Sequence, residues 1–124
     1  MSRGFDWGGR FASFQNAARG ALRLPQEPNA RLGLVISLAV LVLASWLEVE
    51  RRDWALLVFA IGFVLAAEAA NTALEALADR VAPAKHPLVA KAKDAAAGGV
   101  LIAAVTAAAV GLLVLGPPLW QRLF

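Results

Sequence analysis

The 124-residue sequence contains no cysteine, no tyrosine and only one histidine. The lack of cysteine excludes disulfide frameworks, Cys-ligated zinc, iron–sulfur clusters and thiol nucleophiles, and a single histidine excludes a multi-histidine metal site. Charged residues are also scarce, at 17% of the chain against 60% hydrophobic residues. This is too little polar sequence to cover a soluble domain of this size, and it is the opposite of a disordered composition. The composition therefore indicates a membrane protein.

The motifs of the common nucleotide-binding folds are absent as well. The chain has no GxxxxGK[ST] loop, no GxGxxG after a strand and no protein-kinase catalytic loop. These absences exclude a conventional kinase or ATPase fold. The net charge of +3, on so apolar a chain, points to orientation in a membrane and not to a nucleic-acid partner.

Four helices account for the hydropathy pattern, and we expect one all-α membrane domain over residues 1–124. Residues 10–24 place Phe11 and Phe14 on an apolar stripe beside arginines, which is typical of a helix lying in the membrane interface. The alternative is a short helix packed on protein. Three transmembrane helices are predicted at about residues 31–47, 54–81 and 94–119, the last ending at Pro117-Pro118.

The second apolar segment carries an unusual polar stripe, which we call the acidic face: Glu68, Asn71, Glu75 and Asp79. At about 100° per residue, these four side chains fall within roughly 80° of arc. Such side chains are costly against lipid, so they should face other helices, water or a cation. If Trp54 marks the outer interface, the stripe begins in the cytoplasmic leaflet, roughly 21 Å along the helix.

Carboxylates without histidine or cysteine are hard oxygen ligands suited to Mg²⁺, which commonly binds with nucleotide phosphates. A second carboxylate can accept a proton from an alcohol. The stripe therefore permits phosphoryl transfer at the membrane surface. Two other interpretations stay open: a cation path through an oligomer, and a non-catalytic assembly protein whose polar side chains only join helices or pair with connector lysines.

The string AEAANTALEALAD at 67–79 resembles the signature E-x-x-N-[ST]-A-[IL]-E-x-x-x-D of the prokaryotic diacylglycerol kinase and undecaprenol kinase family. Three other stretches agree with that family: SFQNAARG at 13–20, Glu27 with Arg31, and HPLVAKAKDAAAGGVL at 86–101. The resemblance covers about residues 11–116. It implies a homotrimer in the cytoplasmic (inner) membrane that uses Mg-ATP to phosphorylate a lipid hydroxyl, with sites shared between protomers.

The resemblance also implies roles for individual residues. Glu68 takes the place of the catalytic base, and Asn71 would orient the reacting groups. Glu27 and Glu75 take the metal-carboxylate positions beside the ATP phosphates. Further ATP contacts are implied for Lys85, His86, Lys93 and Asp94, and lipid contacts for Arg10, Glu68 and Ala97.

Ordinary roles remain open for several of these residues. Lys93 and Arg10 are also suited to anchoring at the interface. His86 also suits a hydrogen bond within the connector. Glu27 also fits a solvated surface charge.

Two details bear on which lipid is the substrate. NTALE and HPL look more like the undecaprenol-kinase branch, whereas the diacylglycerol branch tends to NSAIE and often has Ser where Ala97 stands. Undecaprenol is therefore expected ahead of diacylglycerol. Gly33 departs from the family pattern, which has a histidine at this position.

Basic residues predict the orientation of the chain in the membrane. Nine lie in the N-terminal segment and the second connector, and three lie in the first loop and at the C-terminus. Basic segments stay in the cytoplasm. We therefore expect a cytoplasmic N-terminus and a C-terminus on the opposite side. A reporter fused after residue 124 that proves active only outside the cytoplasm would support this orientation, and a cytoplasmic reporter would reverse it.

Overall fold

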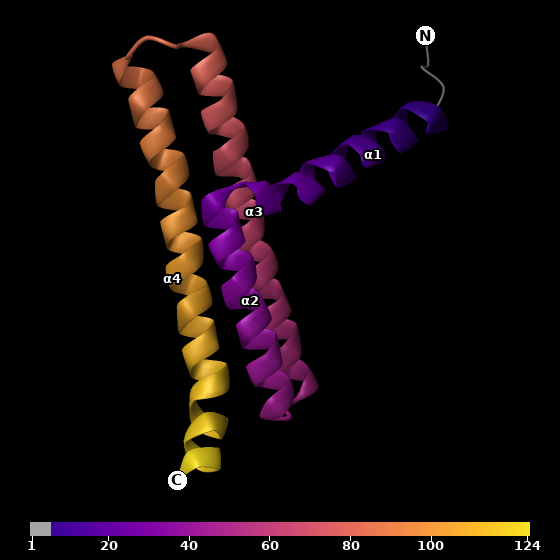
Figure 1. Ribbon diagram of the computed structural model, residues 1–124, viewed down its shortest axis with the longest axis vertical. Helices are drawn as coiled ribbons and strands as arrows, with labels where there is room; N and C mark the ends of the chain where they lie inside the picture. Colours follow the sequence, from indigo (N-terminus) through magenta and orange to yellow (C-terminus); the bar gives the residue numbers. More distant parts are fainter. Residues whose placement is uncertain (1–5) are drawn as a thin grey trace.

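The computed structural model describes residues 6–124, which form one short 3-10 helix and four α-helices. These are α1 (Trp7–Arg23), η1 (Leu24–Gln26), α2 (Pro28–Trp46), α3 (Arg51–Val81) and α4 (Pro87–Leu123). Figure 1 shows α2, α3 and α4 side by side, with α1 projecting sideways from the start of α2. The last three are long and apolar enough to cross a membrane. The predicted architecture, an N-terminal helix with three spanning helices, is confirmed.

Helix α1 begins at Trp7, three residues before the predicted start. The Asp6 side chain caps it by accepting a hydrogen bond from the backbone N–H of Gly8, at 3.0 Å. The aromatic side chains Phe11 and Phe14 are exposed. This unpartnered stripe is the face that the sequence assigned to the membrane interface.

The spanning helices also begin earlier than predicted. Pro28 opens α2, since proline is favoured in the first helical turn, where its missing N–H costs nothing. Helix α4 begins at Pro87, seven residues before the predicted start at 94, because Nδ1 of His86 accepts a hydrogen bond from the N–H of Leu88 at 3.2 Å. The charges of residues 91–94 interrupt the apolar run but not the helix.

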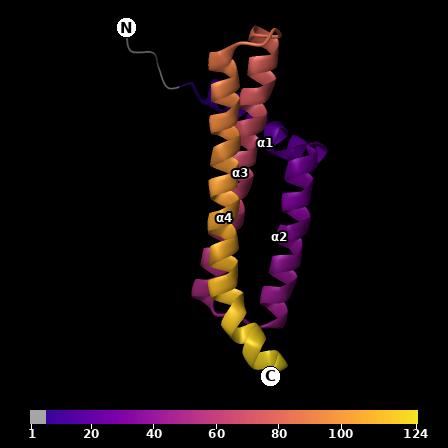
Figure 2. The same cartoon turned by 90° about the vertical axis from the view of Figure 1, so that its left-hand side faces the viewer.

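Helix α4 does not end at Pro117-Pro118, where the sequence predicted its end, but continues to Leu123. The two prolines remove backbone donors, and the last turns bend aside (Figure 2). The guanidinium of Arg122 then lies 4.9 Å from the ring centroid of Trp46, over its face. A cation–π contact therefore ties the end of α4 to the end of α2.

The hydrophobic core lies at this end of the bundle, which we call the tryptophan end. It is formed by Ala44, Leu47, Leu57, Val114 and Leu115. Along the rest of the bundle α3 and α4 pack against each other (Figure 1). At about 1.5 Å per residue these two helices are roughly 46 and 55 Å long, longer than a hydrocarbon core of about 30 Å. Part of the α3–α4 hairpin must therefore stand outside the hydrocarbon.

The turn between α2 and α3 contains one residue in the left-handed region, Glu48, with φ of 52°. It follows the helix in a Schellman arrangement, in which the N–H of Val49 donates to the carbonyl of Ala44 at 3.3 Å. The N–H of Glu48 itself donates to the carbonyl of Ser45 at 3.2 Å. Glycine is the residue that best suits this position.

We expect Glu48→Gly to raise the free energy of unfolding by about 1 kcal/mol, because glycine avoids the clash between Cβ and the following carbonyl oxygen. The measurement is thermal unfolding in detergent micelles. Glu50→Gly is the matched control, since Glu50 has an ordinary φ of −69° and should gain nothing. Equal or lower stability of Glu48→Gly would contradict the expectation.

Candidate active site

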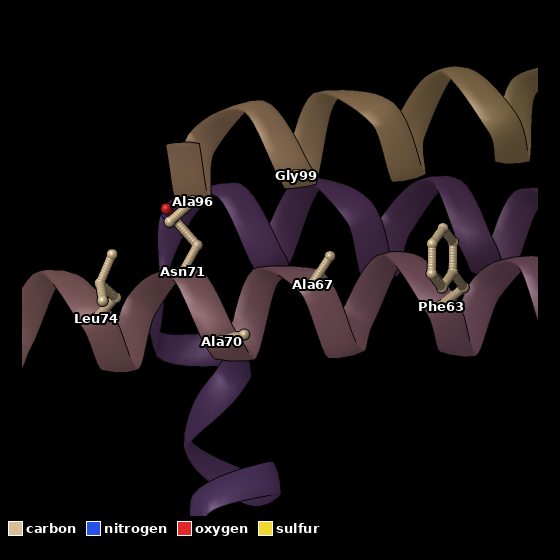
Figure 3. Close-up of a pocket in the computed structure, with 7 residues that line it drawn as sticks. All are labelled: Phe63, Ala67, Ala70, Asn71, Leu74, Ala96 and Gly99. Atoms are coloured by element: carbon tan, nitrogen blue, oxygen red, sulfur yellow. The ribbon is translucent and has the colours of Figure 1, made fainter. Parts of the chain in front are cut away.

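The acidic face divides into a buried part and an exposed part. Glu68 and Asn71 are each only 8% exposed, whereas Glu75 and Asp79 are exposed. In Figure 3, α2 runs behind α3 and begins near the level of Asn71, and the chain that precedes α2 leaves the bundle there. Between Asn71 and the connector, α3 packs against α4. The four side chains of the acidic face share one side of α3, but two of them are buried and two are exposed.

Both buried side chains carry acceptor atoms that have no hydrogen-bond partner among residues 6–124. The Oδ1 atom of Asn71 is fully buried and accepts no hydrogen bond. No hydrogen bond or ion pair within residues 6–124 involves the carboxylate of Glu68. A buried polar group without a partner costs about 1–3 kcal/mol. These acceptors are therefore suited to a donor that comes from outside the chain.

Asn71 borders an open apolar groove between α3 and α4, of about 430 Å³. Its side chain points from α3 toward Ala96 of α4 (Figure 3). The other lining residues are Phe63, Ala67, Ala70, Leu74 and Gly99. Small side chains keep this groove open, and Gly99 has free space where a Cβ would stand.

A second hollow, of about 550 Å³, lies at the connector between α3 and α4. We call it the connector hollow. Three of the predicted nucleotide residues, Lys85, His86 and Lys93, line it together with Asp79. The Lys93 ammonium donates to Oδ1 of Asp79 at 2.9 Å and thereby joins α4 to α3. The fourth predicted residue, Asp94, follows Lys93 on α4 and is exposed.

Glu27 stands at the corner between η1 and α2, with its side chain exposed. The Arg31 side chain stabilises this corner by donating to the carbonyls of Pro25, at 3.2 Å, and Gln26, at 3.4 Å. No group of three or more acidic or histidine side chains suited to a metal occurs among residues 6–124. Mg²⁺ commonly takes one or two carboxylates and completes its shell with phosphates and water. The magnesium role that the resemblance implies for Glu27 and Glu75 stays a prediction.

The two remaining predicted contacts lie apart from both hollows. Arg10 is exposed on α1, which projects from the bundle (Figure 1). Ala97 is exposed on α4, next to Ala96 of the groove. The structure thus gathers Lys85, His86 and Lys93 at one place and the Glu68–Asn71 pair at another, and brings neither Arg10 nor Ala97 into a described contact with them.

Sequence reasoning raised pairing of the acidic face with connector lysines but did not single out Lys93 as the partner of Asp79. It also did not identify the role of Arg31 at the corner. A signal for the first was present, because Asp79 and Lys93 flank the short connector. Residues on either side of a tight helical hairpin lie on adjacent helices. The hydrogen bonds of Arg31 depend on a 3-10 turn that no sequence pattern indicated.

Comparisons with known proteins agree with this architecture. The family model for prokaryotic diacylglycerol kinase matches residues 15–115. The undecaprenol kinase of Bacillus subtilis is 36% identical over 110 residues, covering 88% of this chain and 89% of its own. The diacylglycerol kinase of Escherichia coli K12 is 38% identical over 104 residues, covering 84% of this chain and 77% of its own.

A further relative has the highest identity of these three but matches over a shorter length. The diacylglycerol kinase of Synechocystis is 41% identical over 94 residues, covering 75% of this chain and 54% of its own. The matched residues include the acidic face, the connector and most of α4. The chain is therefore a membrane protein that belongs to the prokaryotic diacylglycerol kinase family of lipid kinases.

Proposed function

We propose that this protein transfers the γ-phosphoryl group of ATP to the hydroxyl of a membrane lipid, giving ADP and a lipid phosphate. The observation that carries the proposal is the buried, unpartnered pair Glu68 and Asn71. It lies on α3 near the level at which α2 begins (Figure 3). A lipid hydroxyl is a hydrogen-bond donor that arrives from the bilayer at that level, and it would supply the missing partner.

In this proposal Glu68 acts as the general base. Its carboxylate takes the proton of the lipid hydroxyl as the oxygen forms a bond to the γ-phosphorus. The bond from that phosphorus to the bridging oxygen of ADP breaks, and the electron pair leaves with ADP. Asn71, one turn further along α3, would hold the hydroxyl or a phosphate oxygen in place.

The nucleotide would occupy the connector end of the hairpin. Lys85, His86 and Lys93 line the connector hollow, where they can meet phosphate oxygens, and Asp94 lies beside them. Glu75 is two helical turns from Glu68, about 10 Å along the axis. Glu75 and Glu27 would hold Mg²⁺, which screens the charge of the phosphates during transfer.

The site also has a defined place in the cell under this proposal. The positive residues would hold the N-terminus and the connector on the cytoplasmic side of the inner membrane, where ATP is available. The chain would assemble as a homotrimer, with Arg10 and Ala97 contributing lipid contacts across the assembled site. Self-association would also cover apolar side chains that a single chain leaves exposed, such as Phe63 and Leu77.

The two other interpretations of the acidic face are less well supported. A cation path requires polar side chains in a continuous row, but Glu68 and Asn71 are buried while Glu75 is exposed. A purely structural role requires that the stripe join helices, and among the bonds formed within residues 6–124 only that of Asp79 does so. Family membership favours the kinase over both.

We expect Glu68→Gln to reduce kcat roughly 10²- to 10⁴-fold, the usual contribution of a general base, while MgATP binding is retained. Glu75→Gln should weaken MgATP binding at least about tenfold, since a charged ligand is removed. The measurements are phosphate transfer to lipid in mixed micelles and binding of a non-hydrolysable MgATP analogue. Glu50→Gln, at the tryptophan end, is the control for loss of an acid far from the site. Full turnover by Glu68→Gln would refute its assignment.

The lipid preference follows from NTALE, HPL and Ala97, and we propose undecaprenol. With radiolabelled ATP, purified protein should phosphorylate undecaprenol with a higher kcat/KM than diacylglycerol in matched micelles. Protein heated until inactive is the blank for both lipids. A higher kcat/KM for diacylglycerol would reverse the preference without touching the kinase assignment, and phosphorylation of neither lipid would count against the kinase itself.

A further inference from the structure

The ion pair between Asp79 and Lys93 has no assigned part in the reaction. It joins the last turns of α3 to the first turns of α4, and the Nζ–Oδ1 distance is 2.9 Å. Both residues also line the connector hollow. The side chain of Lys93 is 37% exposed and that of Asp79 is 71% exposed. The pair therefore stands at the rim of the hollow, in contact with water.

An exposed pair of this kind contributes little to stability. Its position matters more, because the bond fixes the end of a long flexible side chain. An ammonium group has three N–H donors. One is directed to Asp79, which leaves two for other acceptors. A free lysine would have to lose its rotamer freedom on binding, whereas Lys93 is already held at the rim.

The charges around the hollow indicate which acceptors those are. Lys85 and Lys93 are cationic, His86 adds a polar ring, and Asp79 is the acid among the lining residues. Glu75, one turn earlier on α3, is a further negative charge that acts on Lys93. The hollow thus suits a polyanion accompanied by a cation, as a nucleotide polyphosphate with its metal would be.

We propose that Asp79 is a positioning residue for the kinase reaction: it holds the Lys93 ammonium at the rim of the connector hollow, so that the lysine is ready to bind a phosphate oxygen of MgATP. The inference rests on the proposed function, since it gives the hollow a nucleotide to bind. Asp79 itself touches neither phosphate nor lipid in this arrangement. Its effect passes entirely through Lys93.

The test is a double-mutant cycle measured on steady-state kinetics with the full-length protein. Asp79→Ala should raise the KM for MgATP about 1.5- to 5-fold, the range expected for an exposed ion pair, with kcat and the KM for lipid unchanged. Asp79→Glu keeps a carboxylate within reach and should recover part of the loss. In a Lys93→Met background, Asp79→Ala should have no further effect on the KM for MgATP.

The control variant removes a comparable ion pair elsewhere. Glu50 and Arg52 form an exposed pair at 3.5 Å at the tryptophan end, and Glu50→Ala should leave the KM for MgATP unchanged. Thermal unfolding of each variant in detergent separates binding from folding: a merely structural pair would lower stability and kcat together and leave the KM for MgATP alone.

Each other result overturns a definite part of the argument. An unchanged KM for MgATP in Asp79→Ala, or an equal rise in the Lys93→Met background, would refute the positioning role. If the unsubstituted protein neither bound MgATP nor phosphorylated lipid, the proposed function would fail instead. The two failures are distinguishable because the first requires an active parent protein.

Discussion

The structure depends on where a polar side chain can be kept in a chain that is mostly hydrocarbon. A carboxylate or amide in the bilayer loses its hydration and is stable only where protein or water replaces it. Helix α3 meets this constraint by burying Glu68 and Asn71 within the bundle and by leaving Glu75 and Asp79 exposed on the stretch that leads to the connector. The same constraint explains why the bundle is longer than the hydrocarbon core: the charged part of the α3–α4 hairpin must reach water.

Different parts of the bundle therefore have different roles. The tryptophan end holds the apolar core and the contact between Arg122 and Trp46, and thereby fixes the helices relative to one another. The middle of α3 holds the buried acceptors Glu68 and Asn71. The connector end presents lysines, a histidine and acids to water. A lipid kinase needs these last two environments within a few helical turns, because its two substrates differ so strongly in polarity.

Much of this could be predicted from the sequence because membrane helices leave a strong signal. Their number, their order and the acidic face follow from hydropathy and a 3.6-residue period. The ends of the helices were predicted less well. His86 starts α4 through its side chain, and Pro117 bends that helix instead of ending it. A cap depends on one hydrogen bond, and the effect of a proline depends on whether neighbouring helices hold the chain in place.

The sequence by itself determined the membrane class, the polar stripe on α3 and the kinds of residue that meet phosphate, because spacing along a helix fixes which side chains share a face. It did not determine that this face divides at Asn71, or that Lys93 is bound to Asp79. Those features depend on where α2 begins beside α3 and on how the 82–86 connector brings α4 back against α3. Contacts between helices depend on how all the helices pack together, and the spacing of residues along one helix does not fix that packing.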